Sequence, residues 1–410
     1  MKTNNCRFCN ESLNFNFVDL GISPLANSFL EKHELQKKEL RYPLHAYVCG
    51  NCFLVQLEEF EKAETLFSDY LYFSSYSRTW LEHAKDYVKM IIPKLKLNSS
   101  NQVIEIASND DYLLQFFGSK NIPVLGIEPA LNIAKEAEKK NIPTITEFFG
   151  VETAKKLAKK EMFADLLIGN NVLAHVPNLN DFVEGMRIIL KKSGVITLEF
   201  PHLLKLIENN QFDTIYHEHF SYFSFLTVQK ILLHHNLEIF DVEEISTHGG
   251  SLRIFVKHRE DKSKKISSNV DNLTKKEIKF GYDNITIYQE FQKNIDKIRD
   301  DIKIFFNNAK KKKKVIVGYG APAKGNTLLN YCKIETKSMK FTVDLSIHKQ
   351  GLFLPGTHIP IYNPKKINEE KPDYVFILPW NLKDEIMEQL QFIRKWGGKF
   401  VIPIPEVKIL

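Results

Sequence analysis

Two pairs of cysteines constrain the fold of the N-terminal part of this 410-residue chain. Cys6 and Cys9 form one C-x-x-C pair, and Cys49 and Cys52 form a second pair about 40 residues later. Each pair fits a tight turn whose thiolates point at one ion, and two such turns complete a tetrahedral shell. Four thiolates favour zinc, and a closed shell is structural. The spacing therefore predicts a structural Zn²⁺ site; the alternatives are two unrelated reduced pairs or redox motifs.

Cysteine usage and charge limit the cellular setting. The fifth cysteine, Cys332, has no local partner and is expected to be a small core residue. Five cysteines in this length indicate a reduced, cytoplasmic protein, and no apolar stretch approaches the roughly 20 residues that span a bilayer. The net charge of +6, from 56 basic and 50 acidic residues, suits an anionic ligand and does not demand nucleic acid. We expect a cytoplasmic protein with no membrane or nucleic-acid partner.

Strand and helix patterns alternate from residue 101 onward, which indicates a mostly parallel sheet covered on both faces. The polar segment 261–308 is predicted to be largely helical and to connect two α/β blocks. The predicted fold class is α/β, with a small zinc-binding domain (1–65), a central Rossmann-like domain (66–260) and a C-terminal Rossmann-like domain (261–410).

The first strand of the central block, 103–107, ends in small and polar residues, where a doubly wound sheet binds ligands. About 20 residues later the second strand ends in Glu128, which is placed to accept hydrogen bonds from both ribose hydroxyls. The loop has no G-x-G-x-x-G pattern and no P-loop lysine, so an adenosine with a sulfonium and an amino-acid tail suits it better than a diphosphate. The predicted cofactor is S-adenosylmethionine, and another nucleotide is the alternative. Its expected contacts are Glu105, Ala107, Asn109, Asp110, Glu128, Pro129, Asn170 and Asn171.

A short segment after the strand at 194–200 carries Tyr216, His217, Glu218 and His219. Four hydrogen-bonding or ionisable side chains next to aromatic residues indicate a catalytic segment more than a structural one. A lone histidine would more often be structural.

The chain resembles the nucleotide-sugar C-methyltransferases that act on 4-keto-deoxysugars. The similar stretches cover nearly the whole chain and occur in the same order. They are the two cysteine pairs, 24–27, 69–77, 105–114, 126–129, 170–177, 199–201, 216–219, 248–251 and 318–321. This resemblance implies a zinc domain, a central S-adenosylmethionine domain and a C-terminal Rossmann-like domain.

The resemblance also implies residue roles. His219 corresponds to the general base, with Tyr216 and Glu218 beside it, and His175 to the histidine after the fourth strand. A tyrosine that reaches the sugar corresponds to Tyr70, with Tyr72 and Tyr76 as alternatives, and Tyr76 is also expected to contact substrate. One departure is Asp111, which stands where the family usually has glycine.

The proposed chemistry is consistent with these side chains. A carbon beside a ketone loses its proton to a neutral histidine, and the resulting enolate carbon attacks the sulfonium methyl. Glu218 is placed to hold the imidazole tautomer, and a tyrosine or His175 to donate to the enolate oxygen. The expected reaction is methylation of a carbon next to the ketone, most plainly C3. Methylation of oxygen or nitrogen on a related sugar is the alternative.

The C-terminal block contains a glycine-rich loop, 318–327, between a strand and a helix. Gly320, Lys324 and Asn326 are expected to bind the nucleotide sugar, because such a loop lets the backbone approach a phosphate. The alternative is a vestigial domain that only braces the sugar site. The resemblance makes a thymidine diphosphate sugar the default, with guanosine, cytidine or uridine diphosphate open.

Two other classes remain weaker hypotheses. An NAD-dependent epimerase or reductase predicts a Y-x-x-x-K pair or a complete dinucleotide fingerprint, and neither stands in a suitable place. A non-catalytic zinc adaptor does not account for the segment 216–219. The protein is expected to be a monomer, and its Lys, Asn and Ile content favours a role in bacterial polysaccharide synthesis.

Overall fold

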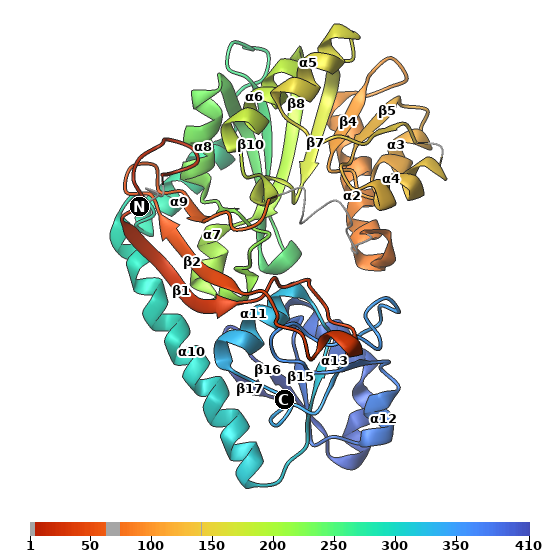
Figure 1. Ribbon diagram of the computed structural model, residues 1–410. Coiled ribbons are helices and arrows are strands. Elements are labelled where there is room, and N and C mark those ends of the chain that lie inside the picture. Colours follow the sequence, from red (N-terminus) through yellow and green to blue (C-terminus); the bar gives the residue numbers. More distant parts are fainter. Residues whose placement is uncertain (1–4, 63–73, 141) are drawn as a thin grey trace. The chain divides into compact units, whose positions relative to one another are not determined.

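A computed structural model describes residues 5–62, 74–140 and 142–410 (Figure 1). The chain divides by contacts into two compact units. Unit 1 comprises Met1–Leu13, Cys49–His202 and Phe220–Asp283, and unit 2 comprises Asn14–Val48, Leu203–His219 and Asn284–Leu410. Each unit therefore gathers segments that lie far apart in sequence. The three predicted domain ranges remain a prediction.

Unit 1 contains a seven-stranded sheet in the order β10-β11-β8-β7-β4-β5-β6. Its central strands are parallel, and β11 and β10 extend the sheet in antiparallel fashion. This confirms the predicted α/β class and the buried strands. The strands are β4 (Val103–Ile106), β5 (Val124–Ile127), β6 (Thr144–Ile145), β7 (Ala164–Asn170), β8 (Leu190–Pro201), β10 (Leu237–Ile245) and β11 (Ser251–His258).

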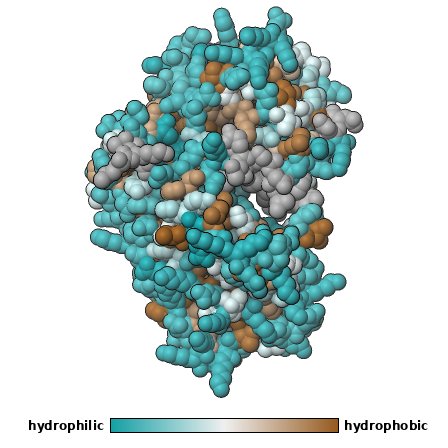
Figure 2. Space-filling model, viewed as in Figure 1, coloured by the Kyte–Doolittle hydropathy of each residue, from teal (hydrophilic) through white to brown (hydrophobic). Residues whose placement is uncertain are grey.

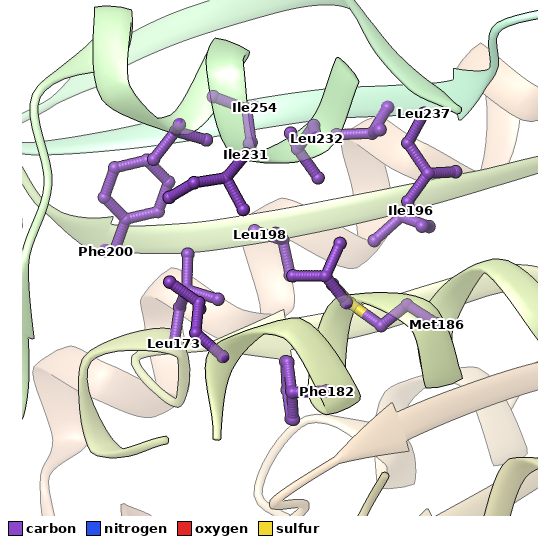
Figure 3. Packing of buried hydrophobic residues seen from close by; sticks show 14 of the residues in the cluster. Leu173, Phe182, Met186, Ile196, Leu198, Phe200, Ile231, Leu232, Leu237 and Ile254 are labelled. Atoms are coloured by element: carbon purple, nitrogen blue, oxygen red, sulfur yellow. The ribbon is translucent and has the colours of Figure 1, made fainter. Parts of the chain in front are cut away.

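Alternating side chains of this sheet feed two hydrophobic clusters, one on each face. Ile196 and Leu198 of β8 pack with apolar residues of α6 (Leu179–Ile189) and α8 (Phe225–His234), as Figure 3 shows. Val195 points to the other face, toward α2 (Arg78–Leu95). The other elements of unit 1 are β3 (Val55–Leu57), β9 (Ser221–Tyr222), α3 (Leu114–Gly118), α4 (Leu131–Glu138), α5 (Val151–Lys159), α9 (Ser268–Lys279), η2 (Ser74–Tyr76), η3 (Leu173–His175) and η5 (Thr247–Gly249).

Unit 2 contains a second sheet in the order β14-β13-β12-β15-β16-β17, parallel except for β17. It also contains an antiparallel pair, β1 (Phe15–Ser23) and β2 (Tyr42–Val48). Its other elements are α7 (Leu203–Glu208), α10 (Ile285–Lys311), α11 (Ala323–Cys332), α12 (Lys366–Glu370), α13 (Lys383–Gln389), η1 (Lys32–Glu34), η4 (Phe212–Thr214), η6 (Trp380–Leu382), η7 (Gln391–Trp396), β12 (Ile316–Tyr319), β13 (Thr342–Val343), β14 (Ile361–Tyr362), β15 (Tyr374–Ile377), β16 (Lys399–Ile402) and β17 (Lys408–Ile409).

The segment predicted as a helical connector forms two helices with different partners. The first, α9, belongs to unit 1, where Val270 and Leu273 join the core. The second, α10, belongs to unit 2, where Phe291 stacks on Phe17 of β1 with ring centroids 4.9 Å apart. Each helix can pack in a different unit because each carries its own apolar stripe.

A mostly polar surface is expected when the apolar residues are buried in the cores of the two units. Figure 2 shows a mostly hydrophilic face with scattered apolar groups. Within the described residues, no helix combines the length and apolar character that crossing a membrane requires.

Candidate active site

The two cysteine pairs of unit 1 meet at one point. Cys6 Sγ lies 3.5 Å from Cys52 Sγ, and Cys9 Sγ lies 3.5 Å from Cys49 Sγ. All four sulfurs lie within 4.8 Å of one another. Ligands about 2.3 Å from a tetrahedral zinc ion are about 3.8 Å apart, so the four thiolates fit that ion. With no other metal ligand in the group, the cluster suits a structural role.

The carboxyl ends of β4, β5 and β7 lie at one edge of the parallel sheet, where the cofactor was predicted. Glu105 of β4 is 1% exposed, and neither of its carboxylate oxygens has a hydrogen-bond partner among the described residues. Burial raises its pKa well above the ordinary value, and the nearby carboxylates of Asp111 and Glu128 raise it further. A buried acid among other acids favours a cationic ligand, so this edge fits the positively charged sulfonium and ammonium groups of S-adenosylmethionine.

The loop after β4 is held in an unusual backbone conformation. Ala107, Asn109 and Asp111 all have φ between 53° and 58°. Glu128 at the end of β5 fixes this loop, because Oε2 accepts from the Asn109 amide at 3.0 Å and Oε1 accepts from the Ala130 amide at 2.9 Å. Pro129 follows Glu128 in the chain and is half-buried. The carboxylate predicted to hold the ribose therefore also shapes the loop.

Two serines and a lysine that sequence reasoning missed support this loop. Asn109 Oδ1 accepts from the Ser74 amide at 2.9 Å, and Asp110 accepts from the hydroxyl of Ser75. Lys140 donates to the Asp110 carbonyl. The serines lie in the family-like stretch 69–77, whose tyrosines were predicted to reach the sugar; Lys140 carried no local signal.

A glutamine at position 128 is expected to weaken cofactor binding. Its amide group would point a donor at the amide of Asn109 or Ala130, and the loop would have to shift. We expect the Kd for S-adenosylmethionine to rise by about tenfold or more, since hydrogen bonds to charged groups contribute about 1.5–3 kcal/mol. Titration calorimetry measures it. Glu152→Gln, on the exposed surface of α5, is the matched control and should leave the Kd unchanged. An unchanged Kd in Glu128→Gln would contradict the assignment.

Asp111 adopts the left-handed conformation at the position where glycine is usual in the family. Its φ is 58° and its side chain is fully buried. Burial raises its pKa from 3.8 to about 7, with Lys140 opposing the shift. The turn is therefore retained, with a buried acid added beside the cofactor edge.

Replacing Asp111 by glycine or asparagine is expected to stabilise unit 1 near neutral pH. As pH rises from about 4 to about 7, the unfolded chain releases this proton while the folded chain keeps it, so folding stability falls and the full cost is present above pH 7. We expect a gain of about 2–4 kcal/mol at pH 7.5 and a smaller one at pH 5. Urea unfolding at both pH values measures it. Equal stability of variant and wild type at pH 7.5 would refute the buried-charge argument.

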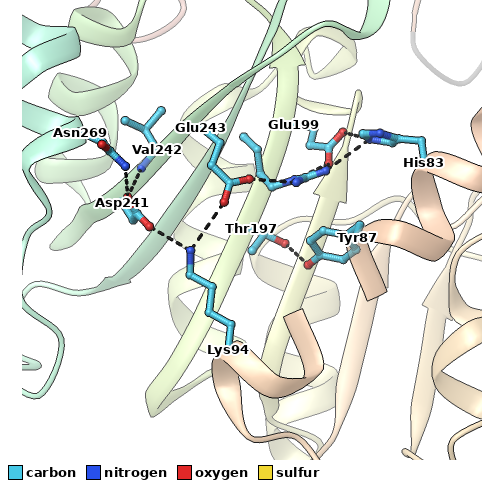
Figure 4. A network of polar contacts seen from close by, with 10 residues as sticks. His83, Tyr87, Lys94, Thr197, Glu199, Asp241, Val242, Glu243 and Asn269 are labelled. Carbon is cyan, nitrogen blue, oxygen red and sulfur yellow. Dashed lines mark hydrogen bonds and ion pairs between the residues drawn. The ribbon is translucent and has the colours of Figure 1, made fainter. Parts of the chain in front are cut away.

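A polar network that sequence reasoning did not find surrounds the end of β8 (Figure 4). Glu199 is 1% exposed and accepts from Arg253 Nε at 2.7 Å and from His83 Nε2 at 2.8 Å. Burial acts to raise the pKa of Glu199, but His83 and Arg253 outweigh it and the pKa is lowered. Arg253 also donates to Glu243 at 3.0 Å. The network joins α2, β8, β10 and β11; only Glu199 lay in a family-like stretch.

The loop after β7 carries the remaining predicted residues of unit 1. Asn170 ends the strand, and its buried Oδ1 has no partner among the described residues. Asn171 has φ 54°, and its amide donates to the Glu199 carbonyl at 2.7 Å. His175 ends η3 and is half-buried. Tyr70 and Tyr72 lie outside the described residues; Tyr76 ends η2, and only its backbone is described.

Unit 2 places His219 in a defined hydrogen-bonding pattern. Nδ1 lies 3.0 Å from the Thr214 carbonyl, and Nε2 lies 2.9 Å from the Tyr216 hydroxyl. A carbonyl only accepts, so Nδ1 carries the hydrogen and Nε2 accepts from Tyr216. Nε2 is therefore the unprotonated ring nitrogen, and its lone pair accepts the Tyr216 hydroxyl.

The other two members of the segment have different partners. Glu218 is 3% exposed, and its Oε1 accepts from Asn27 Nδ2 at 3.2 Å; burial raises its pKa. His217 Nε2 donates to the Pro43 carbonyl at 3.2 Å, and burial lowers its pKa. The hydrogen bond that fixes the His219 tautomer thus comes from the Thr214 backbone, while Glu218 is tied to the loop 24–27.

The predicted nucleotide residues lie at the start of α11 in the same unit. Lys324 donates to Asn381 and lies over the Trp380 ring, 4.3 Å from its centroid. Burial lowers the pKa of Lys324 to about 8, with Asp213 opposing the shift, so the lysine is charged at pH 7. Gly320 has φ 86°, and a Cβ there would lie 2.6 Å from Pro379.

Contacts inside unit 2 tie α11 to the segment that carries His219. Asn326 Nδ2 donates to the Ala26 carbonyl at 2.6 Å, next to the Asn27 that contacts Glu218. Thr327 Oγ1 donates to the Ile215 carbonyl at 3.1 Å. The base candidate and the nucleotide candidates therefore share one unit, and the cofactor residues and His175 share the other.

Solved structures of methyltransferases resemble part of the chain. An S-adenosylmethionine-dependent methyltransferase from Anabaena variabilis covers 50% of this chain and 100% of its own, at 15% identity and a TM-score of 0.35. One from Archaeoglobus fulgidus covers 43% of this chain and 94% of its own, at 16% identity and a TM-score of 0.35.

Family models and a full-length relative match much more of the chain. The models are described as "Putative zinc binding domain" (residues 6–67), "Methyltransferase domain" (79–242) and "C-methyltransferase C-terminal domain" (246–405). The C-methyltransferase NovU of Streptomyces niveus is 31% identical over 405 residues, which are 99% of this chain and 96% of that protein. The zinc and cofactor predictions are thereby confirmed at the level of the family. The chain belongs to the C-methyltransferase family, and it is an S-adenosylmethionine-dependent methyltransferase with an N-terminal four-cysteine zinc-binding cluster.

Proposed function

We propose that this enzyme methylates the carbon next to the ketone, at C3, of a nucleotide-linked 4-keto-deoxysugar. The observation that supports a carbon acceptor most directly is the orientation of His219. Its Nδ1–H is held by the Thr214 carbonyl at 3.0 Å, so Nε2 is the unprotonated ring nitrogen. Its lone pair accepts from Tyr216 at 2.9 Å and can take a proton from carbon once that hydroxyl turns to the substrate. Such a base is required when the acceptor is a carbon acid.

The enolate forms by a proton transfer to His219. The Tyr216 hydroxyl, which donates to Nε2 before the reaction, turns its hydrogen to the ketone oxygen. Nε2 then takes the proton from the carbon next to the ketone, and the electron pair moves onto the ketone oxygen. Nε2–H is then a donor, so the Tyr216 hydroxyl 2.9 Å away becomes its acceptor. The hydrogen of Tyr216 stays on the side of the enolate oxygen, and His175 is a second candidate donor.

The bound cofactor supplies an electrophilic methyl on a positively charged sulfur. The chain's own residues orient the two reactants. Glu128, Glu105 and the loop 107–111 hold the cofactor end. In unit 2, the protonated Lys324 and the amino end of α11 are the groups that we propose bind the diphosphate. Thymidine diphosphate is the first nucleotide to test.

The test is methyl transfer to a panel of nucleotide 4-keto-6-deoxysugars in deuterated water, read by mass. We expect one added methyl and deuterium exchange next to the ketone. Exchange without transfer would place the proposed sugar class in doubt. Transfer that needs a sugar hydroxyl or amine, with no exchange, would favour an oxygen or nitrogen acceptor.

Lys324→Met is expected to weaken nucleotide binding with little effect on S-adenosylmethionine. The substitution keeps the apolar stem over Trp380 and removes the charge. The wild-type affinity for thymidine diphosphate should also fall as pH rises from 7 to 9, because Lys324 loses its proton near pH 8. Calorimetry at both pH values measures this. If the variant binds thymidine diphosphate as tightly as the wild type does, the C-terminal domain would only brace the sugar site.

A further inference from the structure

The first metal-binding turn, residues 6–9, sends one side chain away from the metal cluster. Arg7 Nη1 donates to the Pro177 carbonyl at 3.0 Å, and Arg7 Nη2 donates to the Leu57 carbonyl at 2.5 Å. The guanidinium also lies over the Phe220 ring, with Cζ 5.4 Å from its centroid. One charged, planar group therefore serves three segments of unit 1.

Those three segments are already linked by backbone hydrogen bonds. The Phe220 amide donates to the Ala174 carbonyl at 2.7 Å, and the Leu57 amide donates to the Phe220 carbonyl at 3.0 Å. In the sequence, His175 lies between Ala174 and Pro177. The Ala174 carbonyl is hydrogen-bonded to Phe220, and the Pro177 carbonyl to Arg7. The loop that carries His175 is thus anchored on both sides of that residue.

The turn itself is held to the rest of unit 1 by other groups. Gln56 Oε1 accepts from the Arg7 amide at 2.9 Å, and Gln56 Nε2 donates to Cys6 Sγ at 3.2 Å. Asn180 Nδ2 donates to the Phe8 carbonyl at 2.9 Å. The backbone of Arg7 is therefore fixed by the cysteine cluster and by its neighbours, and the side chain projects from a rigid base.

We propose that Arg7 is a positioning residue, through which the metal-binding turn holds the His175 loop in the geometry that methyl transfer needs. The proposal rests on the function proposed above, in which His175 is the second candidate donor to the enolate oxygen. A guanidinium reaches two carbonyls at fixed angles, whereas a lysine ammonium acts as a single point. Losing the guanidinium leaves a carbonyl on the far side of His175 without its donor and frees the loop to shift.

The test compares Arg7→Met and Arg7→Lys with Asn180→Ala, the matched control that also touches the turn but not the Pro177 carbonyl. For each protein we would measure zinc per chain, the melting temperature, the Kd for S-adenosylmethionine, kcat, KM and hydrogen exchange of the amides of residues 172–176. Arg7→Met should retain zinc and the cofactor Kd, lose exchange protection at the His175 amide, and lose kcat by roughly 10- to 100-fold. Arg7→Lys should have a kcat and an exchange protection between those of the wild type and Arg7→Met.

Asn180→Ala should lower the melting temperature while kcat and the protection of residue 175 stay close to wild type. Removing zinc from the wild type should reproduce the loss of protection seen in Arg7→Met. The proposal is overturned if Arg7→Met keeps both protection and kcat, or if Asn180→Ala lowers kcat as much. If wild type methylates no sugar, the substrate proposal fails, and exchange at residue 175 still decides the role of Arg7.

Discussion

Replacing His219 by asparagine is expected to abolish enolate formation and methyl transfer while the protein stays folded. The asparagine Nδ2 can still donate to the Thr214 carbonyl, as Nδ1 of His219 does at 3.0 Å, but the side chain offers no counterpart of the basic Nε2. Positioned general bases contribute about 10²- to 10⁴-fold, so we expect a loss of that size in kcat and in deuterium exchange. Mass measurement in deuterated water follows both steps in one reaction.

His217→Gln is the matched control, because this second histidine lies two residues away and its Nε2 donates to the Pro43 carbonyl at 3.2 Å. Glutamine keeps a donor near that position, so kcat should change by only a few fold. S-adenosylmethionine should bind the His219→Asn protein with wild-type affinity, since its predicted contacts lie in unit 1. Exchange at the wild-type rate in His219→Asn would remove His219 from the mechanism.

Loss of the metal is expected to cost more stability than any surface substitution. Cys6, Cys49 and Cys52 are buried and belong to the same hydrophobic cluster as the sheet of unit 1. Apparent binding free energies of structural zinc are about 10–16 kcal/mol, and part of that becomes folding stability. At about 2–4 °C per kcal/mol, we expect chelation or Cys9→Ser to lower the melting temperature by about 10 °C or more. Calorimetry with a parallel zinc assay measures this.

Cys332 provides the control for cysteine chemistry. It is buried in α11 of unit 2, whereas the four-cysteine cluster contains residues of unit 1, and burial raises the pKa of Cys332 to about 12. Cys332→Ala should leave zinc at one per chain and lower the melting temperature by only a few degrees. A Cys9→Ser protein that keeps zinc and the wild-type melting temperature would show that the cluster is dispensable for folding.

Local patterns were sufficient for part of the fold and of the candidate site. The C-x-x-C spacing identified the four metal ligands, because each pair closes a turn within four residues. The strand 103–107 and the acid about 20 residues later predicted one edge of the sheet for the cofactor, and the structure brings the two strand ends together there. The departure at Asp111 could be noticed in the sequence, but its left-handed backbone and burial came from the structure.

The segment predicted as a connector shows where periodicity was insufficient. Residues 261–308 read correctly as helical, but the pattern does not show that α9 packs in unit 1 and α10 in unit 2. An apolar stripe shows that one face of a helix is buried, but it does not show which part of the protein packs against that face.

The sequence by itself determined the four-cysteine cluster, and it predicted the cofactor strand and the catalytic segment with His219, since each depends on residues close together in the chain. Only the tertiary structure decided which group orients each side chain. Thr214 holds His219 through a backbone carbonyl, whose chemistry is the same at every residue. Arg7 meets Pro177 across 170 positions, and Arg253 meets Glu199 across 54. Such partners are set by how the chain packs, so no local pattern records them.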